Sequence, residues 1–344
     1  MAELVSYNGI WGWLWRRSFV FISWGGPENL KIEDLPLRGL RKGEVRLRVQ
    51  AVGLNRAESM FYHGMYLEEP QLPSGLGYEA AGVIAEVGPG VDRDWVGKTA
   101  STIPAFSMIE YGMVGEEVIA PVAALGEYPP NLTPVEGAAI WMQYVTAYGA
   151  LIEFGHVMAG DFVLIPAASS SVGLAAIQIV KDAGAVSIAA TRTSKKRDQL
   201  LALGADHVIA TEEENIVLRV HEITGGKGAR VIFDTVAGPF VEQLAKAAAQ
   251  GGIIFEAGAL SLQSTPFPLL RSLAKALTFR GYTLWEITRH PDLLEVAKEY
   301  VYDRLADGRF KPKIAKTFPF DKIVDAYRYL ESNEQVGKVV VTVP

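Results

Sequence analysis

A run of small residues between an apolar segment and a helical pattern marks the first place where this chain could do chemistry. Residues 165–173 read IPAASSSVG, with Ala167, Ser170 and Gly173 spaced three apart. Small side chains let backbone amides approach a phosphate closely, and the start of the following helix stabilises its negative charge. The turn therefore predicts a dinucleotide pyrophosphate site, with a tight strand–helix connection that binds nothing as the alternative. The expected contacts are Ala168, Ser169, Ser170, Ser171, Val172 and Gly173.

A basic segment follows the next apolar run, where a dinucleotide-binding fold recognises the adenine ribose. Residues 191–197 read TRTSKKR, and no Asp or Glu occurs between residues 185 and 197. An NAD site places an acid there to accept hydrogen bonds from the ribose hydroxyls, whereas cations and hydroxyl donors suit a 2′-phosphate. Cations at the start of a helix also oppose its dipole, so we expect an anion to compensate them. The segment predicts NADPH, with a solvated basic helix start as the alternative, and the expected contacts are Thr191, Arg192, Thr193 and Lys196.

The composition removes several kinds of site. The 344 residues include no cysteine, which excludes disulfides, thiolate catalysis and cysteine-based zinc or iron–sulfur centres. The five histidines include no pair at metal-ligand spacing, so we expect no metal site. With 33 Lys and Arg against 39 Asp and Glu, the net charge is −6, which argues against nucleic acid as a partner. If the chain is an enzyme, an organic cofactor therefore remains as the source of its chemistry.

Two kinds of sequence pattern divide the chain into the strands and helices that would position these segments. In the first third, runs broken by Gly and Pro indicate strands at residues 44–49, 80–87 and 116–120. After residue 134, short apolar runs alternate with helical patterns, which is typical of βαβ units in a parallel sheet. The expected strands lie at 162–165, 185–190, 207–209, 231–233, 253–255, 277–281 and 337–342, and the expected helices at 135–154, 172–183, 195–203 and 321–333.

These patterns predict an α/β protein, with a Rossmann-type doubly wound parallel sheet domain inserted in a β-rich domain. We expect residues 146–315 to form the inserted domain and residues 1–145 and 316–344 to form the β-rich one. A cleft between two such domains is the usual place for a ligand.

Several motifs, in this order, resemble those of the medium-chain dehydrogenase/reductase superfamily, and more closely its zinc-independent quinone oxidoreductase (zeta-crystallin-like) branch. The resemblance covers nearly everything after residue 20 and includes GGPE at 25–28, GLNRAE at 53–58, GYEAAG at 77–82, LGADH at 203–207, FDTV at 233–236 and GKVV at 337–340. It implies a GroES-like fold for the β-rich domain. Zinc-dependent members carry Cys at the position of Asn55 and His at the position of Tyr78, so the resemblance also implies that no catalytic zinc is bound.

The resemblance further implies which residues handle the substrate. Asn55 and Tyr66 match polar positions that the family places around the nicotinamide and the acceptor, and Glu58 holds the family's usual acidic position, so these three are the expected catalytic residues. Arg280, Tyr282 and Tyr144 are weaker candidates. The remaining expected cofactor contacts are Thr146, Val236, Gly258 and Ala259.

The absence of a metal ligand set narrows the reaction. Alcohol oxidation loses most without a Lewis acid, whereas a quinone or enone delocalises the charge left by hydride addition. We therefore expect an NADPH-dependent oxidoreductase that reduces quinones or α,β-unsaturated carbonyls. The alternatives are an alcohol dehydrogenase-like enzyme, an enoyl-thioester reductase and a non-catalytic NADPH-binding interaction protein.

The expected partner, besides a small-molecule substrate, is a second copy of the chain. In this superfamily the last strand of the nucleotide sheet, here near residues 277–283, commonly extends the sheet across a two-fold axis. The tryptophan-rich residues 9–15 precede two arginines, the reverse of a secretory signal, and interfacial membrane anchoring is the minor alternative to a packed or disordered start. No apolar segment reaches about 20 residues, so we expect a cytoplasmic protein without a membrane partner.

Overall fold

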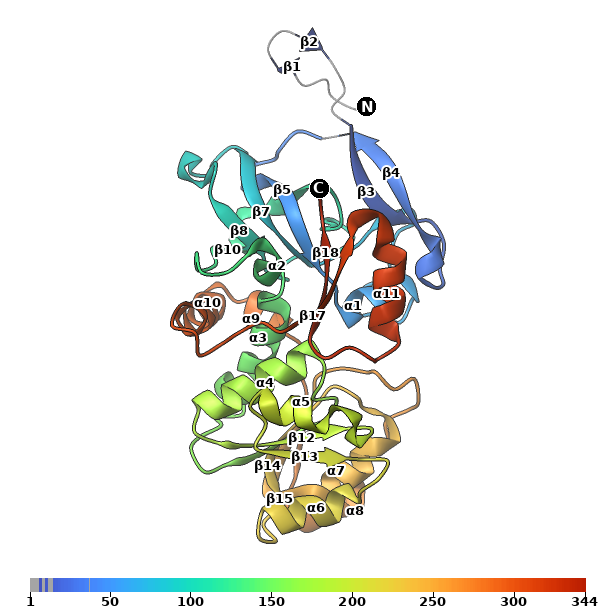
Figure 1. Ribbon diagram of the computed structural model, residues 1–344, viewed down its shortest axis with the longest axis vertical. Coiled ribbons are helices and arrows are strands. Elements are labelled where there is room, and N and C mark those ends of the chain that lie inside the picture. The colour runs from blue at the N-terminus through green and yellow to red at the C-terminus, as the bar shows by residue number, and fades with distance from the viewer. Residues whose placement is uncertain (1–5, 8–9, 12–14, 37) are drawn as a thin grey trace. The chain divides into compact units, whose positions relative to one another are not determined.

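The computed structural model describes residues 6–7, 10–11, 15–36 and 38–344, which divide into two compact units (Figure 1). Unit 1 comprises Met1–Met142 and Ile314–Pro344, and unit 2 comprises Gln143–Lys313. The tryptophan-rich stretch considered for membrane anchoring falls mostly outside the described residues. No helix in the described part of the chain is long and apolar enough to cross a membrane.

Unit 1 is built on a seven-stranded, mostly antiparallel sheet. Its order is β10-β8-β7-β5-β18-β17, and β9 also pairs with β5. The central strand β5 (Glu44–Gly53) lies antiparallel to β7 (Glu79–Val87) and to β18 (Lys338–Thr342), so the last strand of the chain completes the sheet that the first third begins. The predicted strands of this region are confirmed. The other strands are β8 (Thr99–Thr102), β9 (Glu117–Pro121), β10 (Leu125–Gly126) and β17 (Ile314–Pro319).

A smaller sheet and the helices α1, α2 and α11 complete the part of unit 1 that the structure describes. The smaller sheet has the order β4-β3-β6, and β1 pairs with β2 in the first residues. Apolar residues three and four apart on α11 are buried, as expected for an amphipathic helix, and its Tyr327 joins Leu47 and Phe61 in the core. The bounds are β1 (Ser6–Tyr7), β2 (Ile10–Trp11), β3 (Trp15–Phe21), β4 (Leu30–Pro36), β6 (Ser74–Gly75), α1 (Arg56–Tyr62), α2 (Pro134–Gly137) and α11 (Ile323–Glu331).

Unit 2 is a six-stranded parallel sheet with helices on both faces. Its order is β13-β12-β11-β14-β15-β16, so the chain runs outward from β11 and then crosses back to β14, which is the doubly wound order. Figure 1 shows α4 and α5 on one side of this sheet and α6 and α8 on the other. All six predicted strands are confirmed: β11 (Phe162–Ile165), β12 (Val186–Thr191), β13 (His207–Ala210), β14 (Ala229–Asp234), β15 (Ala248–Glu256) and β16 (Thr278–Gly281).

The prediction of one continuous helix at residues 135–154 is wrong, because the structure has two helices there. The amide of Ala138 closes α2 by bonding back to Pro134, and the carboxylate of Glu79 accepts the amide of Met142 and begins a new helix, α3. The helix predicted from residue 195 likewise starts with a tight turn at Ser194–Lys196. The helices are α3 (Trp141–Tyr148), continued by a π-helical turn (Gly149–Glu153), α4 (Ser171–Asp182), α5 (Arg197–Ala202), α6 (Ile216–Ile223), α7 (Val241–Ala247), α8 (Leu269–Lys275), α9 (Trp285–Thr288) and α10 (Pro291–Ala306).

Candidate functional site

All the predicted cofactor residues except Thr146 follow strands at one edge of the sheet in unit 2. The serine-rich turn follows β11, and residues 191–196 begin at the end of β12. Val236 follows β14, and residues 258–259 follow β15. Because the carboxyl ends of parallel strands share an edge, these segments lie where doubly wound folds bind dinucleotides. Thr146 lies on α3 of the same unit.

The turn after β11 has the close strand-to-helix approach that its small residues predict. The amide of Ala168 donates to the carbonyl of Ala190 on the neighbouring strand at 3.0 Å. Ser170 caps α4, since its Oγ accepts the amide of Gly173 at 3.1 Å. A Cβ at Gly173 would lie 2.7 Å from the Cα of Ala168, so only glycine lets the helix begin this close to the turn.

The basic segment is joined to this turn by a lysine. Lys196 Nζ donates to Ser169 Oγ at 3.1 Å, which links the two parts of the predicted phosphate site. Arg192 is exposed. Arg197 is engaged elsewhere, because it pairs with Glu214 and donates to the carbonyl of Val208 at 3.0 Å. Arg192 and Lys196, the two predicted cationic contacts, are therefore not engaged by Glu214 as Arg197 is.

The chain itself supplies part of the negative charge expected beside the basic segment. Glu213 Oε1 accepts the backbone amide of Ser194 at 2.8 Å and its hydroxyl at 3.2 Å. These hydrogen bonds hold the pKa of Glu213 below its usual range. Glu213 lies outside residues 185–197, the range in which the sequence offers a position for an acid at the ribose. The available signal was its place after β13, the parallel neighbour of β12.

The same edge of the sheet carries buried polar groups at the ends of β14 and β15. Asp234 and Glu256 are register partners at the ends of β14 and β15, and Asp234 accepts the amides of Val236 at 2.8 Å and Ala237 at 3.1 Å. Burial, and then the charge of Asp234, raises the pKa of Glu256 to about 7. Within the described residues, both oxygens of Glu256 and the hydroxyl of Thr235 are buried without a hydrogen-bond partner. Such groups fit a ligand that brings its own hydrogen bonds to this edge.

Asn55 and Glu58, two of the three predicted catalytic residues, lie inside unit 1. Glu58 is completely buried and accepts the amide of Asn55 at 2.7 Å, the amide of Tyr78 at 3.1 Å and the hydroxyl of Tyr327 at 3.1 Å. Burial raises the pKa of Glu58 to about 7, against the opposite effect of the Asn55 and Tyr78 donors and of the charge of Lys338. The contacts of Glu58 hold the start of α1 in place.

Asn55 belongs to a buried ionic cluster that the sequence analysis did not identify. Its Oδ1 accepts Lys338 Nζ at 2.6 Å, and its Nδ2 donates to Glu79 Oε2 at 3.2 Å. Lys338 and Glu79 form an ion pair whose side chains are 0% and 1% exposed. Glu79 also accepts the amide of Met142 at 2.9 Å. Within unit 1 the cluster therefore connects β7 and β18 with Met142 and with Asn55 at the start of α1, and it uses the polar atoms of Asn55 to do so.

Tyr66 lies in an aromatic group next to that cluster. Its ring packs edge-on against Phe61 and Tyr78, each at 6.3 Å between ring centroids, and it hydrogen-bonds to the side chain of Tyr78. The Tyr78 hydroxyl in turn donates to Glu68 at 3.4 Å. Burial, and then the neighbouring Tyr66, raises the pKa of Tyr78 far above neutrality, so this phenol keeps its proton. Through Tyr78 the structure brings all three predicted catalytic residues into one neighbourhood.

The weaker candidates have internal contacts in unit 2. Tyr144 is completely buried and stacks on Phe310 at 4.9 Å, and Tyr282 is also buried. Arg280 pairs with Glu286. Among the residues that the structure describes, no three His, Asp or Glu side chains are grouped as a metal site would require.

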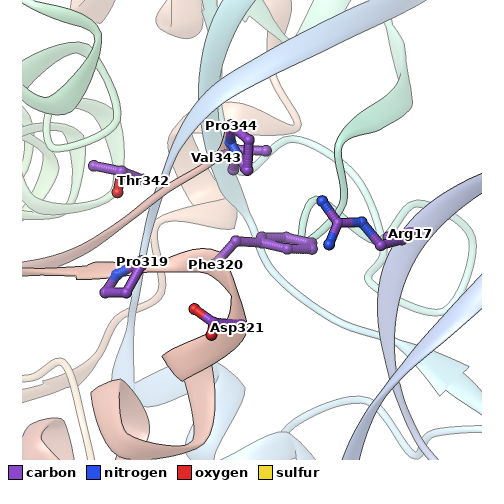
Figure 2. A pocket seen from close by; sticks show the side chains of 7 residues that line it. All are labelled: Arg17, Pro319, Phe320, Asp321, Thr342, Val343 and Pro344. Carbon is purple, nitrogen blue, oxygen red and sulfur yellow. The ribbon is translucent and has the colours of Figure 1, made fainter.

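A pocket of about 320 Å³ lies apart from every predicted site residue (Figure 2). Arg17 of β3, residues 319–321 and residues 342–344 of unit 1 line it. Figure 2 shows the ring of Phe320 pointing toward the guanidinium of Arg17, which lies 5.8 Å from the ring centroid. Arg17 is itself paired with Glu116. We assign no function to this pocket.

Comparison with known proteins connects this geometry to a family. Residues 41–166 match the family model described as "Alcohol dehydrogenase GroES-like domain", and residues 171–299 match "Zinc-binding dehydrogenase". Quinone oxidoreductase 1 of Escherichia coli is 30% identical over 321 residues, which cover 91% of this chain and 95% of that protein. The chain belongs to the medium-chain dehydrogenase/reductase superfamily. This medium-chain oxidoreductase also matches part of the mycoketide-CoA synthase of Mycobacterium tuberculosis, 32% identical over 327 residues, but it spans only 7% of that protein.

Solved structures agree with this assignment of the medium-chain oxidoreductase. An NAD-dependent alcohol dehydrogenase is 31% identical with a TM-score of 0.85, and the match covers 95% of this chain and 100% of that one. Escherichia coli quinone oxidoreductase complexed with NADPH is 27% identical with a TM-score of 0.86, over 95% of this chain and 99% of that one. The predicted family, GroES-like fold and Rossmann-type sheet are confirmed. One of these proteins is NAD-dependent and the other is complexed with NADPH, so the choice of cofactor depends on this chain's own residues.

Proposed function

We propose that this medium-chain oxidoreductase uses NADPH to reduce quinones or α,β-unsaturated carbonyls. The observation that carries the proposal is the pair Arg192 and Lys196 at the end of β12, with Lys196 joined to Ser169 of the phosphate turn. Residues 185–197 contain no acid for the ribose hydroxyls of NAD. The similarity to a quinone oxidoreductase complexed with NADPH supports the same cofactor and reaction class.

The chain's own residues divide the work between holding the cofactor and handling the acceptor. The serine-rich turn and the start of α4 would hold the pyrophosphate, and Arg192 and Lys196 would hold the 2′-phosphate. When bound, the reduced nicotinamide supplies the hydride. Tyr66 is the candidate to orient the acceptor and to supply the proton that follows the hydride. The cluster of Asn55, Glu58 and Lys338 acts on structure rather than on the acceptor. It fixes the start of α1, and this helix ends four residues before Tyr66.

Replacing Tyr66 with phenylalanine tests the proton donor. The change removes one hydroxyl and keeps the ring that packs on Phe61 and Tyr78. If that hydroxyl is the general acid, kcat should fall by about 10²–10⁴-fold while NADPH affinity stays the same. Tyr302→Phe, on an exposed tyrosine of α10, is the matched control. A loss below about tenfold would show that solvent protonates the product and that Tyr66 only packs.

A panel of acceptors tests the reaction class itself. NADPH oxidation is measured with several quinones, enones, an enoyl thioester and, in reverse, simple alcohols. Turnover of quinones or enones supports the proposal. Turnover confined to the enoyl thioester or to alcohols would contradict it, as would tight NADPH binding without turnover of any acceptor.

We further propose that two copies of the chain pair beside β16. This strand ends the order of the parallel sheet, and the preceding segment exposes large apolar side chains, with Leu262 81%, Leu270 79% and Leu273 70% exposed. An apolar surface that continues from a sheet edge is typical of an interface. Light scattering should give twice the 37.4 kDa of one chain.

Leu270→Glu, on exposed α8, should produce the monomer without loss of folding, because a charge cannot be buried unpaired in an interface. Leu218→Glu, at a residue of α6 that is 68% exposed, is the matched control and should leave the dimer intact. A native chain that is monomeric at micromolar concentration would contradict the pairing.

A further inference from the structure

An acid of the neighbouring strand lies on the segment that we assign to the 2′-phosphate. Glu213 comes three residues after β13 and accepts both the amide and the hydroxyl of Ser194. Backbone hydrogen bonds hold the two segments together, from Thr211 to Thr191 at 2.8 Å and from Glu212 to Arg192 at 2.9 Å. The loop after β13 is therefore attached to the basic segment by the two hydrogen bonds of the Glu213 carboxylate and by the two backbone hydrogen bonds beside it.

The donors that Glu213 occupies are ones that a ribose-linked phosphate would use. An amide and a hydroxyl from the same residue, between Arg192 and Lys196 in sequence, form a typical oxyanion contact. A carboxylate and a phosphate cannot share these donors, since both are anions that accept only. Their charges also repel each other at contact distance, and the repulsion is moderate because Glu213 is exposed to solvent.

An uncharged ribose hydroxyl meets no such repulsion. It can donate to a carboxylate, as it does to the acid of an NAD site. Glu213 therefore opposes the phosphorylated cofactor and tolerates the unphosphorylated one, whereas Arg192 and Lys196 act in the opposite sense.

We propose that Glu213 is a specificity-determining residue that lowers the preference of this site for NADPH over NADH, because it places a negative charge on the donors of Ser194. This inference rests on the proposed NADPH site. It differs from a merely structural role, in which Glu213 would only fasten the loop after β13 to the loop after β12.

Binding measurements on Glu213→Gln separate the two roles. Glutamine keeps an oxygen that can accept from Ser194 but removes the charge. Dissociation constants are measured by calorimetry for NADPH, NADH, adenosine 2′,5′-bisphosphate and adenosine 5′-monophosphate. Glu212→Gln is the matched control, because it removes the same charge from the adjacent exposed residue.

Glu213→Gln should bind NADPH and the bisphosphate about 3- to 10-fold more tightly, with NADH and the monophosphate changed by less than about twofold. Glu212→Gln should leave all four within about twofold. Equal changes for NADPH and NADH, an equal effect of Glu212→Gln, or no change in Glu213→Gln would overturn the inference and leave the proposed function standing. If the native protein binds neither NADPH nor the bisphosphate, the proposed function fails as well.

Discussion

Replacing Arg192 and Lys196 together with alanine should weaken NADPH binding by roughly 2–4 kcal/mol, the size of a doubly charge-assisted contact. NADH binding should change little, because the two cations address only the 2′-phosphate in our assignment. The effect is large because Lys196 is already held toward the phosphate turn by Ser169, so little ordering is needed when the ligand arrives. Calorimetric titration with both cofactors, at one fixed ionic strength, measures the difference directly.

A matched control for this double variant is Lys227→Ala with Lys313→Ala, two exposed lysines of unit 2 whose removal changes the net charge equally. The control should keep both affinities within about twofold. Equal affinity of the native protein for NADPH and NADH, together with an unchanged ratio in Arg192→Ala/Lys196→Ala, would contradict the assignment of the 2′-phosphate to these residues.

Replacing Lys338 with methionine should lower the free energy of unfolding by about 3–5 kcal/mol, because it leaves the carboxylate of Glu79 buried without its counter-charge. The side chains of both residues are almost completely inaccessible, so water cannot replace the lost ammonium group. Asn55 would lose a hydrogen bond of 2.6 Å in the same change. Chemical denaturation monitored by intrinsic fluorescence gives the free energy, and the same change at the exposed Lys31 of β4 is the control.

A double variant keeps this prediction testable if Lys338→Met alone does not fold. Glu79→Gln with Lys338→Met removes both charges, while the glutamine oxygen can still accept the amide of Met142. The double variant should recover part of the lost stability, because no unpaired charge remains. A loss below about 1 kcal/mol in Lys338→Met, or a double variant less stable than the single one, would show that the ion pair does not hold this part of the fold.

Local patterns were sufficient to predict the elements that carry the cofactor site. Short apolar runs alternating with helices predicted the six parallel strands of unit 2, and the small residues before Gly173 predicted a close turn ahead of α4. These predictions succeed because burial on both faces of a parallel strand, and steric access at a turn, are encoded within a few consecutive residues. Local patterns did not predict the helix break at residues 138–140 or the turn at residues 194–196. At both places a side chain distant in sequence accepts a backbone amide and decides how the helix begins.

The sequence by itself determined the kind of protein: an α/β chain without cysteine, with a phosphate turn and a basic segment at the ends of neighbouring strands. Only the tertiary structure decided the roles of the charged residues. It pairs Lys338 with Glu79 across 259 positions and joins Glu213 to Ser194 across 19, so Asn55 and Glu58 belong to a buried cluster and the basic segment carries an anion of its own. The physical reason is that the effect of a charge depends on its burial and on its nearest counter-charge, and both are fixed only when distant segments pack together.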